Sequence, residues 1–214
     1  MTKERLYIFD TTLRDGAQTA GIEFSVEDKI SICRLLEDLG VDYIEGGYPG
    51  ANPVDTEFFE TKRTRRAKFT AFGMTKRAGR SAANDPGVQG LINSQAEAVC
   101  FVAKAWDHQI TTALEITLED NLDSLRDSVA ATVAADKEAL IDCEHFFDGF
   151  KANPDYALSC VRAALDAGAR WVVLCDTNGG TMPSEVSDIV ARVLTVAPGD
   201  HLGIHAHDDT GQAV

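Results

Sequence analysis

Two short polar segments, far apart in the chain, carry residue types that bind divalent metal ions. Residues 10–18 read DTTLRDGAQ and residues 205–209 read HAHDD, and each follows an apolar, strand-like run. Alternate side chains of an extended strand share a face, so His205 and His207 are expected to point the same way. With Asp15 facing them, two nitrogens and a carboxylate oxygen leave positions open for substrate, as in a catalytic metal site. The alternative for each segment alone is a solvated turn or strand end.

The composition limits the classes of protein to which this chain can belong. Its 214 residues suffice for one large domain, and its net charge of -14 argues against a nucleic-acid-binding surface. No apolar stretch reaches the ~18 to 20 residues that a transmembrane helix needs, and residues 1–6 lack the apolar segment of a secretory signal. Five scattered cysteines, with no Cys-x-x-Cys pair, suit a reducing compartment. We therefore predict a cytoplasmic protein that binds neither nucleic acid nor membrane.

Strand-like and helical patterns alternate along the chain. The strand-like runs are 6–13, 43–48, 68–74, 97–104, 139–147, 171–176 and 201–207, and the clearest amphipathic helical patterns are 25–40, 118–135, 153–168 and 183–196. This alternation predicts right-handed βαβ units and a parallel sheet.

Polar residues cluster where the strand-like runs end. They are Arg14 and Asp15, Glu45, Glu144, residues 176–178, and His205 with His207. A (β/α)8 TIM barrel builds its active site at this end of its strands. No Gly-x-Gly-x-x-Gly follows the first run, which disfavours a dinucleotide-binding sheet. We therefore predict an α/β protein with the TIM barrel fold.

The predicted barrel is incomplete. Seven strand-like runs are one too few, and residues 210–214 only open what we expect to be the seventh helix. Because natural proteins cover the edges of open sheets, we expect either a fragment of a longer protein or closure by another chain. We predict that residues 1–214 form a single catalytic barrel domain, truncated after the seventh strand and without a regulatory domain.

One basic segment interrupts the acidic chain. Residues 62–68 read KRTRRAK, and we interpret them as a solvated helix end, with cations near the terminal carbonyl groups, rather than as an anion site.

Two segments resemble the signatures of a known family. Residues 13–18, with Lys29 after them, and residues 202–213 are similar to the two motifs of the DRE-TIM metallolyases. This family includes the 2-isopropylmalate, homocitrate and citramalate synthases. The resemblance covers the whole chain, with one departure at Asp208, where the family more often has asparagine.

Three further segments are most similar to citramalate synthases, namely residues 48–53, 144–149 and 175–183. The resemblance implies an acyltransferase that condenses acetyl-CoA with a 2-oxo acid in a metal-dependent Claisen-type step, followed by thioester hydrolysis. We expect the 2-oxo acid to be pyruvate, and the product would then be citramalate, for isoleucine biosynthesis. The resemblance also leads us to expect a homodimer in the full-length protein.

The resemblance implies a role for each polar residue. Asp15, His205 and His207 would bind the divalent ion (Mg, Mn or Zn), Arg14 would offset the alkoxide charge, Thr177 would donate to the oxo-acid carboxylate, and Glu144 would be the acid or base. The alternatives are a structural salt bridge for Arg14 and a helix N-cap for Thr177. Gln18 and Glu45 are weaker candidates for substrate contacts. Asp142 shares a face with Glu144, where the family selects the oxo-acid side chain, yet an acid suits the methyl group of pyruvate poorly.

Other functions remain open. Isopropylmalate and homocitrate synthases differ in the oxo acid, and a related acyl-CoA lyase would use the same metal ligands. The family's further residues for acetyl-CoA activation lie beyond residue 214, so a third reading is a catalytically inactive barrel fragment that binds metal and oxo acid.

Overall fold

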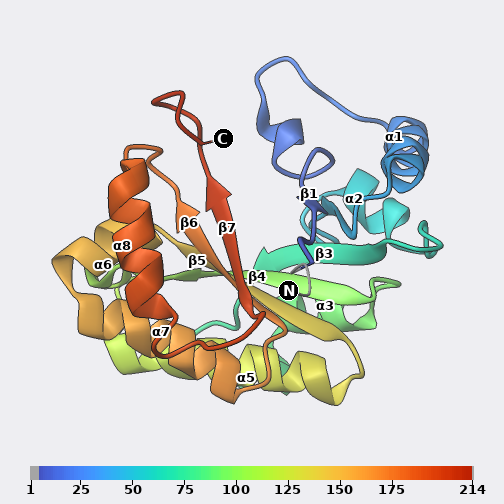
Figure 1. Cartoon of the computed structure of the whole chain (residues 1–214). Helices are drawn as coiled ribbons and strands as arrows, with labels where there is room; N and C mark the ends of the chain where they lie inside the picture. The colour runs from blue at the N-terminus through green and yellow to red at the C-terminus, as the bar shows by residue number, and fades with distance from the viewer. Residues whose placement is uncertain (1–4, 214) are drawn as a thin grey trace. The chain divides into compact units, whose positions relative to one another are not determined.

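The computed structural model describes residues 5–213. Residues 1–4 and residue 214 lie outside the described residues. The first group belongs to the segment in which we expect no secretory signal, and residue 214 belongs to the expected seventh helix. The strands are β1 (Phe9–Asp10), β2 (Tyr43–Gly47), β3 (Lys68–Met74), β4 (Ala98–Lys104), β5 (Glu138–Glu144), β6 (Trp171–Asp176) and β7 (Leu202–Ala206). They form a sheet in chain order, and the pairs β1–β2, β2–β3, β5–β6 and β6–β7 are parallel (Figure 1). A strand order that never reverses is that of a TIM barrel, because a doubly wound sheet has a switch point.

Helices fill most connections between the strands. They are α1 (Val26–Leu39), α2 (Pro53–Phe58), α3 (Pro86–Asn93), α4 (Asp107–Gln109), α5 (Leu118–Ala134), α6 (Phe146–Ala152), α7 (Pro154–Asp166) and α8 (Pro183–Val193). Both ends of α1 are capped. Ser25 accepts a hydrogen bond from the Asp28 N–H, and Gly40 ends α1 in the left-handed conformation, at φ 92°. Local sequence signals therefore set the ends of α1.

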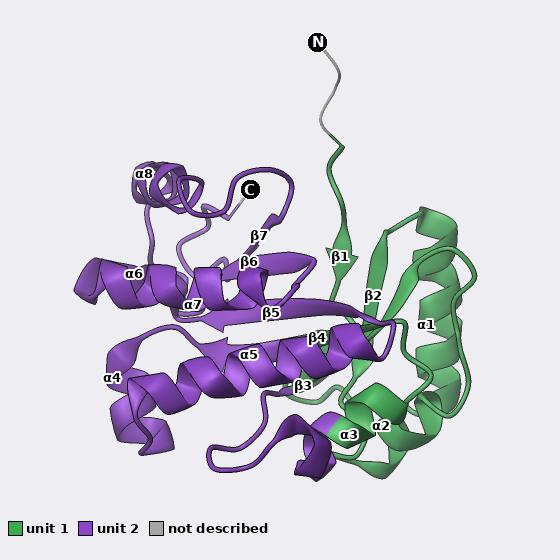
Figure 2. Ribbon diagram, turned by 90° about the horizontal axis from the view of Figure 1, so that it is seen from below, with its two compact units in different colours: residues 1–73, 89–100 green, residues 74–88, 101–214 purple. Residues whose placement is uncertain are grey.

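The chain divides into two compact units (Figure 2). Unit 1 comprises Met1–Gly73 and Gln89–Cys100, and unit 2 comprises Met74–Val88 and Phe101–Val214. Within residues 5–213, none of the helices combines the length and the apolar character needed to cross a membrane.

Three phenylalanines form the centre of unit 1. The rings of Phe59 and Phe69 stack with centroids 4.3 Å apart, and Phe58 meets Phe69 edge-on at 5.4 Å. All three are almost fully buried. A Cβ atom on Gly46 of β2 would lie 2.8 Å from two of these rings. Gly46 is therefore required by the packing of α2 and β3 against β2.

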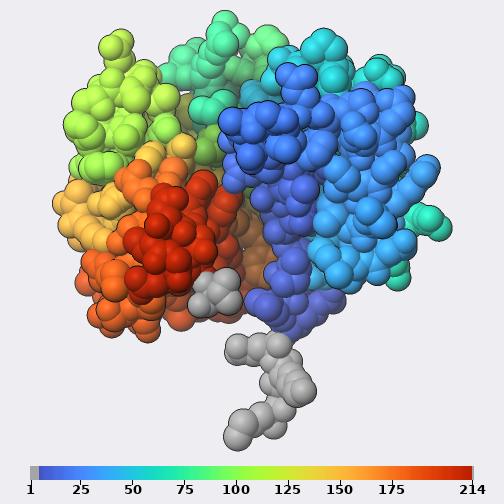
Figure 3. All heavy atoms as spheres, turned by 90° about the horizontal axis from the view of Figure 1, so that it is seen from above, coloured from blue at the N-terminus to red at the C-terminus, as the bar shows by residue number. Residues whose placement is uncertain are grey.

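Some predicted boundaries are wrong. The first strand is shorter than the predicted 6–13, and the fifth ends at Glu144 instead of residue 147. The chain leaves β5 because His145 adopts the left-handed conformation, at φ 55°, which ends an extended strand. Residues 207–213 contain turns and no helix. Residues 208–213 are exposed, and the dark red C-terminal atoms lie on the surface in Figure 3.

The basic segment 62–68 is not a helix end, because α2 ends at Phe58. Arg63 nevertheless caps that helix from a distance, since its Nε donates to the Phe58 carbonyl at 2.9 Å. Residues 65–67 of the segment surround the carboxylate of Glu37. The Glu37 carboxylate accepts the backbone N–H groups of Arg65, Arg66 and Ala67 at 2.8 to 2.9 Å. Burial by itself raises the pKa of Glu37, but these three hydrogen bonds outweigh it and the pKa is lowered.

Replacement of Glu37 by alanine is expected to reduce the free energy of unfolding by about 3 kcal/mol, because three N–H groups lose a charged acceptor. The stabilisation by Glu37 is present above its ordinary pKa of 4.5 and declines as the pH falls through the lowered pKa. Urea unfolding at pH 7 and at pH 3 measures both effects. An equal loss at the two pH values would contradict this account, and Asp38→Ala, at the exposed neighbour, is the control.

Candidate active site

The loop after β1 closes around one backbone carbonyl oxygen. The N–H groups of Arg14, Asp15 and Gly16 all donate to the Thr11 oxygen, at 3.1, 2.8 and 3.2 Å. Three amides on one acceptor leave this turn little freedom. The turn therefore fixes the points at which the side chains of Arg14 and Asp15 leave the backbone.

Arg14 lies between two carboxylates and over an aromatic ring. Its Nε donates to Glu45 Oε2 at 2.6 Å and its Nη1 to Asp15 Oδ1 at 2.9 Å, while its Cζ lies 4.0 Å from the centroid of the Phe72 ring. Burial opposes the charge, but Glu45 and Asp15 outweigh it, so the pKa of Arg14 is raised. The salt bridge that we considered for Arg14 is present. It holds a permanent positive charge beside Asp15.

Lys29 ties this loop to the neighbouring strand. Its buried ammonium group donates to the carbonyl oxygens of Leu13 at 2.9 Å and Gly46 at 2.8 Å, and it pairs with the carboxylate of Asp55. These contacts use all three protons of the ammonium group. Because Leu13 directly precedes Arg14, Lys29 sets the position of the Arg14–Asp15 turn relative to β2.

In unit 2, the register of three strands places polar side chains on one face. Asp142 of β5 pairs with Val173 of β6, and Cys175 of β6 pairs with His205 of β7. Alternation along parallel strands then puts Asp142, Glu144, Cys175 and His205 on the same face.

Glu144 ends β5 beside a lysine that the sequence analysis missed. Lys104, the last residue of β4, forms an ion pair with the Glu144 carboxylate, whose side chain is 26% exposed. The Ala105 N–H donates to the Glu144 carbonyl oxygen at 3.1 Å and joins the ends of the two strands. The signal was available, since Lys104 also ends a strand-like run. A partly exposed, positioned carboxylate is suited to proton transfer.

Thr177 follows β6 and accepts a hydrogen bond from the His145 N–H, with Oγ1 at 2.8 Å. The proposed alternative, a helix N-cap, is wrong because α8 begins only at Pro183, with Met182 as its N-cap residue. A hydroxyl that accepts one hydrogen bond keeps its own proton for donation. The contact therefore leaves Thr177 able to donate to a ligand.

His205 and His207 present their rings together. The ring centroids are 5.1 Å apart and the planes differ by 16°. The predicted common orientation of the two side chains is confirmed. Two nearly parallel imidazoles, one from β7 and one from the residue directly after it, can offer nitrogens to one cation, so the donor chemistry fits a divalent transition metal.

The three remaining candidates for substrate contacts differ in exposure and in their neighbours. Glu45 is completely buried, and its Oε2 accepts a hydrogen bond from Arg14. Gln18 is exposed in the short 3-10 turn after Asp15. Asp142 is buried, and one carboxylate oxygen, the sulfur of Cys175 and a ring nitrogen of His205 lie within 4.8 Å of one another. Asp15 belongs to unit 1 and the two histidines to unit 2, so the three-ligand metal set stays a prediction.

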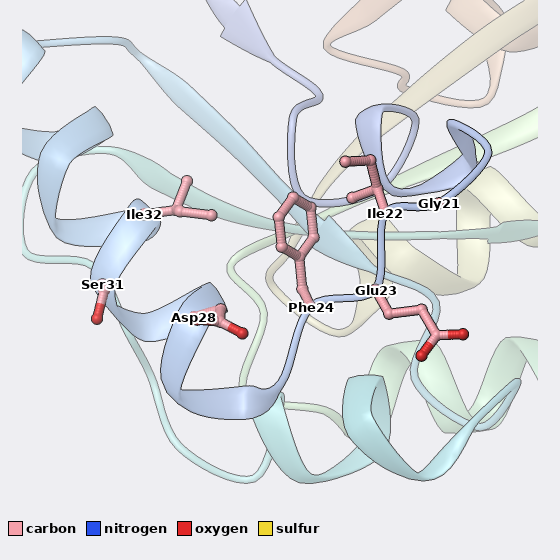
Figure 4. Close-up of a pocket in the computed structure, with 7 residues that line it drawn as sticks. All are labelled: Gly21, Ile22, Glu23, Phe24, Asp28, Ser31 and Ile32. Carbon is pink, nitrogen blue, oxygen red and sulfur yellow. The ribbon is translucent and has the colours of Figure 1, made fainter.

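A separate shallow depression of about 360 Å³ lies at the start of α1 (Figure 4). Ile22, Phe24 and Ile32 supply its apolar lining, and Asp28 is among its polar lining residues. None of the predicted site residues lines it. The candidate active site therefore remains at the strand ends and not at this depression.

Comparisons with known proteins identify the family and the fold of this chain. The model of the HMGL-like family matches residues 5–214. The (R)-citramalate synthase of Streptomyces coelicolor is 51% identical over 99% of this chain, and the 2-isopropylmalate synthase of Sulfurisphaera tokodaii is 31% identical over 100% of it. The chain spans 40% and 53% of these relatives' lengths. The crystal structure of the HMG-CoA lyase from Brucella melitensis shares the fold, with a TM-score of 0.81, 20% identity, and coverage of 99% of this chain and 75% of that one. The predicted fold class is confirmed.

Replacement of Lys29 by methionine is expected to lower the free energy of unfolding by about 3 to 5 kcal/mol, because the charge of Asp55 stays buried without its partner. The double variant Lys29→Met with Asp55→Asn should lose less than the sum of the two single losses. Denaturant unfolding of all four proteins gives the coupling energy. Strictly additive losses would show that the pair does not hold the loop.

Proposed function

The chain belongs to the HMGL-like family, and from this membership we propose that the protein containing it condenses acetyl-CoA with a 2-oxo acid, pyruvate first, to give citramalate. The observation that carries the proposal is the set of polar groups at the strand ends, with Arg14 paired to Asp15 in one unit and the stacked His205 and His207 in the other. The higher identity to a citramalate synthase than to a 2-isopropylmalate synthase supports pyruvate.

The proposed metal ligands are Asp15, His205 and His207. A divalent cation bound there supplies Lewis-acid polarisation of the 2-oxo acid's ketone. Imidazole ligands suit Zn or Mn, and the oxygen-rich substrate suits Mg or Mn. Mn is the ion that suits both the imidazole donors and the substrate oxygens.

The reaction balances with the groups proposed here. The acetyl methyl group loses a proton, its carbon bonds to the ketone carbon, and the ketone oxygen takes up the electron pair and then a proton. Water next attacks the thioester carbonyl, the C–S bond breaks, and CoA leaves as the thiol. Arg14, held charged by Glu45 and Asp15, offsets the negative charge on the ketone oxygen.

Two further residues have proposed roles: Glu144 transfers a proton, and Thr177 binds the oxo acid. Glu144, positioned by Lys104, is the proposed acid or base. Thr177 accepts from the His145 N–H and donates to the carboxylate of the oxo acid. Gln18 is a further proposed substrate contact.

The proposal also covers the domain, the oligomeric state and the cellular compartment of the protein. We infer that residues 1–214 are the incomplete catalytic barrel domain of a cytoplasmic homodimer. All five cysteines are buried thiols rather than disulfides, which is compatible with a reducing compartment.

Purified whole protein with Mn or Mg is expected to release free thiol from acetyl-CoA with pyruvate, and not with 2-oxoisovalerate or 2-oxoglutarate. Arg14→Lys should lower kcat by about 100-fold, because a lysine cannot keep the forked contacts of the guanidinium group. Arg34→Lys, at an exposed position of α1, is the matched control.

Thiol release with 2-oxoisovalerate alone would instead make the protein a 2-isopropylmalate synthase. A folded, metal-loaded protein that releases thiol with none of the three acids would overturn the condensation and favour a binding role.

A further inference from the structure

Asp142 has no evident use as a pocket for a methyl group. It lies on the site face of β5, it is only 8% exposed, and a carboxylate is a poor neighbour for the apolar end of pyruvate. A buried carboxylate needs hydrogen-bond donors or an opposite charge. The groups that face Asp142 in its own unit therefore decide its role.

The strand register brings Asp142 to His205. Asp142 pairs with Val173, and the next residue on that face of β6, Cys175, pairs with His205. The carboxylate oxygen, the Cys175 sulfur and the imidazole nitrogen then lie within 4.8 Å of one another. The Cys175 thiol also lies 3.8 Å from the carbonyl oxygen of Val173, at hydrogen-bond distance for sulfur. Of this group, Asp142 is the strongest acceptor for an imidazole N–H.

A metal-binding histidine has a second ring nitrogen that carries a proton. In proteins this N–H is almost always donated to a carboxylate, a carbonyl oxygen or water, and the contact fixes the tautomer and the angle of the ring. His205 is a proposed ligand, and Asp142 is the carboxylate beside it. The same contact would remove Asp142 from the pocket of the oxo-acid side chain.

The geometry points to Asp142 as the positioning residue of His205: its carboxylate accepts the imidazole N–H and holds the other ring nitrogen toward the cation. The inference about the cation rests on the proposed function, but the inference about the tautomer of His205 does not. Asp142 acts through His205 and does not select the substrate.

The test begins with the metal-free whole protein. Long-range 1H–15N NMR of the His205 ring should show one dominant tautomer in the wild type and a mixture of both in Asp142→Leu. Asp142→Asn, which keeps the size and one acceptor oxygen, should give an intermediate result and guards against a folding defect. Cys175→Ala is the matched control and should keep the wild-type tautomer.

The second readout is the affinity for Mn²⁺ alone, measured by calorimetry. Asp142→Leu should weaken binding by about 10- to 100-fold, while Cys175→Ala should stay within twofold. In the whole protein, Asp142→Asn should raise the Mn²⁺ concentration needed for half-maximal rate and leave the preference for pyruvate over 2-oxoisovalerate unchanged.

An unchanged His205 tautomer in Asp142→Leu, or mixed tautomers in the wild type, would overturn the inference. A changed preference between the oxo acids would overturn it as well and return Asp142 to the substrate pocket. If the wild-type protein releases no thiol, the proposed function fails, yet the tautomer measurement still decides the role of Asp142.

Discussion

The parallel register of the strands is the constraint on which the candidate site depends. In a parallel sheet, every second side chain faces the same way and neighbouring strands end at the same edge. The pairing of Cys175 with His205 and of Asp142 with Val173 therefore assembles the polar face of unit 2 from residues far apart in sequence. A shift of one residue in either pair would turn these groups to the opposite face.

Buried charges then fix the side chains within this frame. Three of the buried or part-buried charges show this: Arg14 pairs with Glu45, Lys29 pairs with Asp55, and Glu37 accepts three backbone N–H groups. Such pairs add little net stability relative to apolar residues of the same size, but a change in one partner is costly. Their effect here is to position side chains. Lys29 binds the carbonyl group of Leu13, just before Arg14. The ion pair of Lys29 therefore helps to fix the position of the Arg14 guanidinium group, for which we propose a catalytic role.

Much of the fold could be predicted from the sequence. The ranges of β3 and β6 match the predicted runs, and the helices α1, α5, α7 and α8 occupy the predicted regions. The failures have local causes. His145 ends β5 early through a left-handed backbone that no composition rule signals, and the short helices α2 and α6 are too brief to show a clear period.

The candidate site was predictable as residue types but not as contacts. Asp15, Glu144, Thr177, His205 and His207 stand out because they lie within or just after the ends of strand-like runs. The residues that position them cannot be recognised in the same way. Lys104 contacts Glu144, and Lys29 contacts Leu13, only because distant segments of the chain pack together. Asp142 shows the same limit, since its neighbour His205 is set by the register of β5, β6 and β7.

The central proposal is that His205, His207 and Asp15 bind a single catalytic metal ion. Pulsed electron paramagnetic resonance of Mn²⁺ bound to the whole protein tests this directly. The account predicts coupling to two imidazole nitrogens, reduced to one in His205→Ala and in His207→Ala, with weaker Mn²⁺ binding in Asp15→Asn. A spectrum without imidazole coupling, or one that neither histidine variant changes, would contradict it.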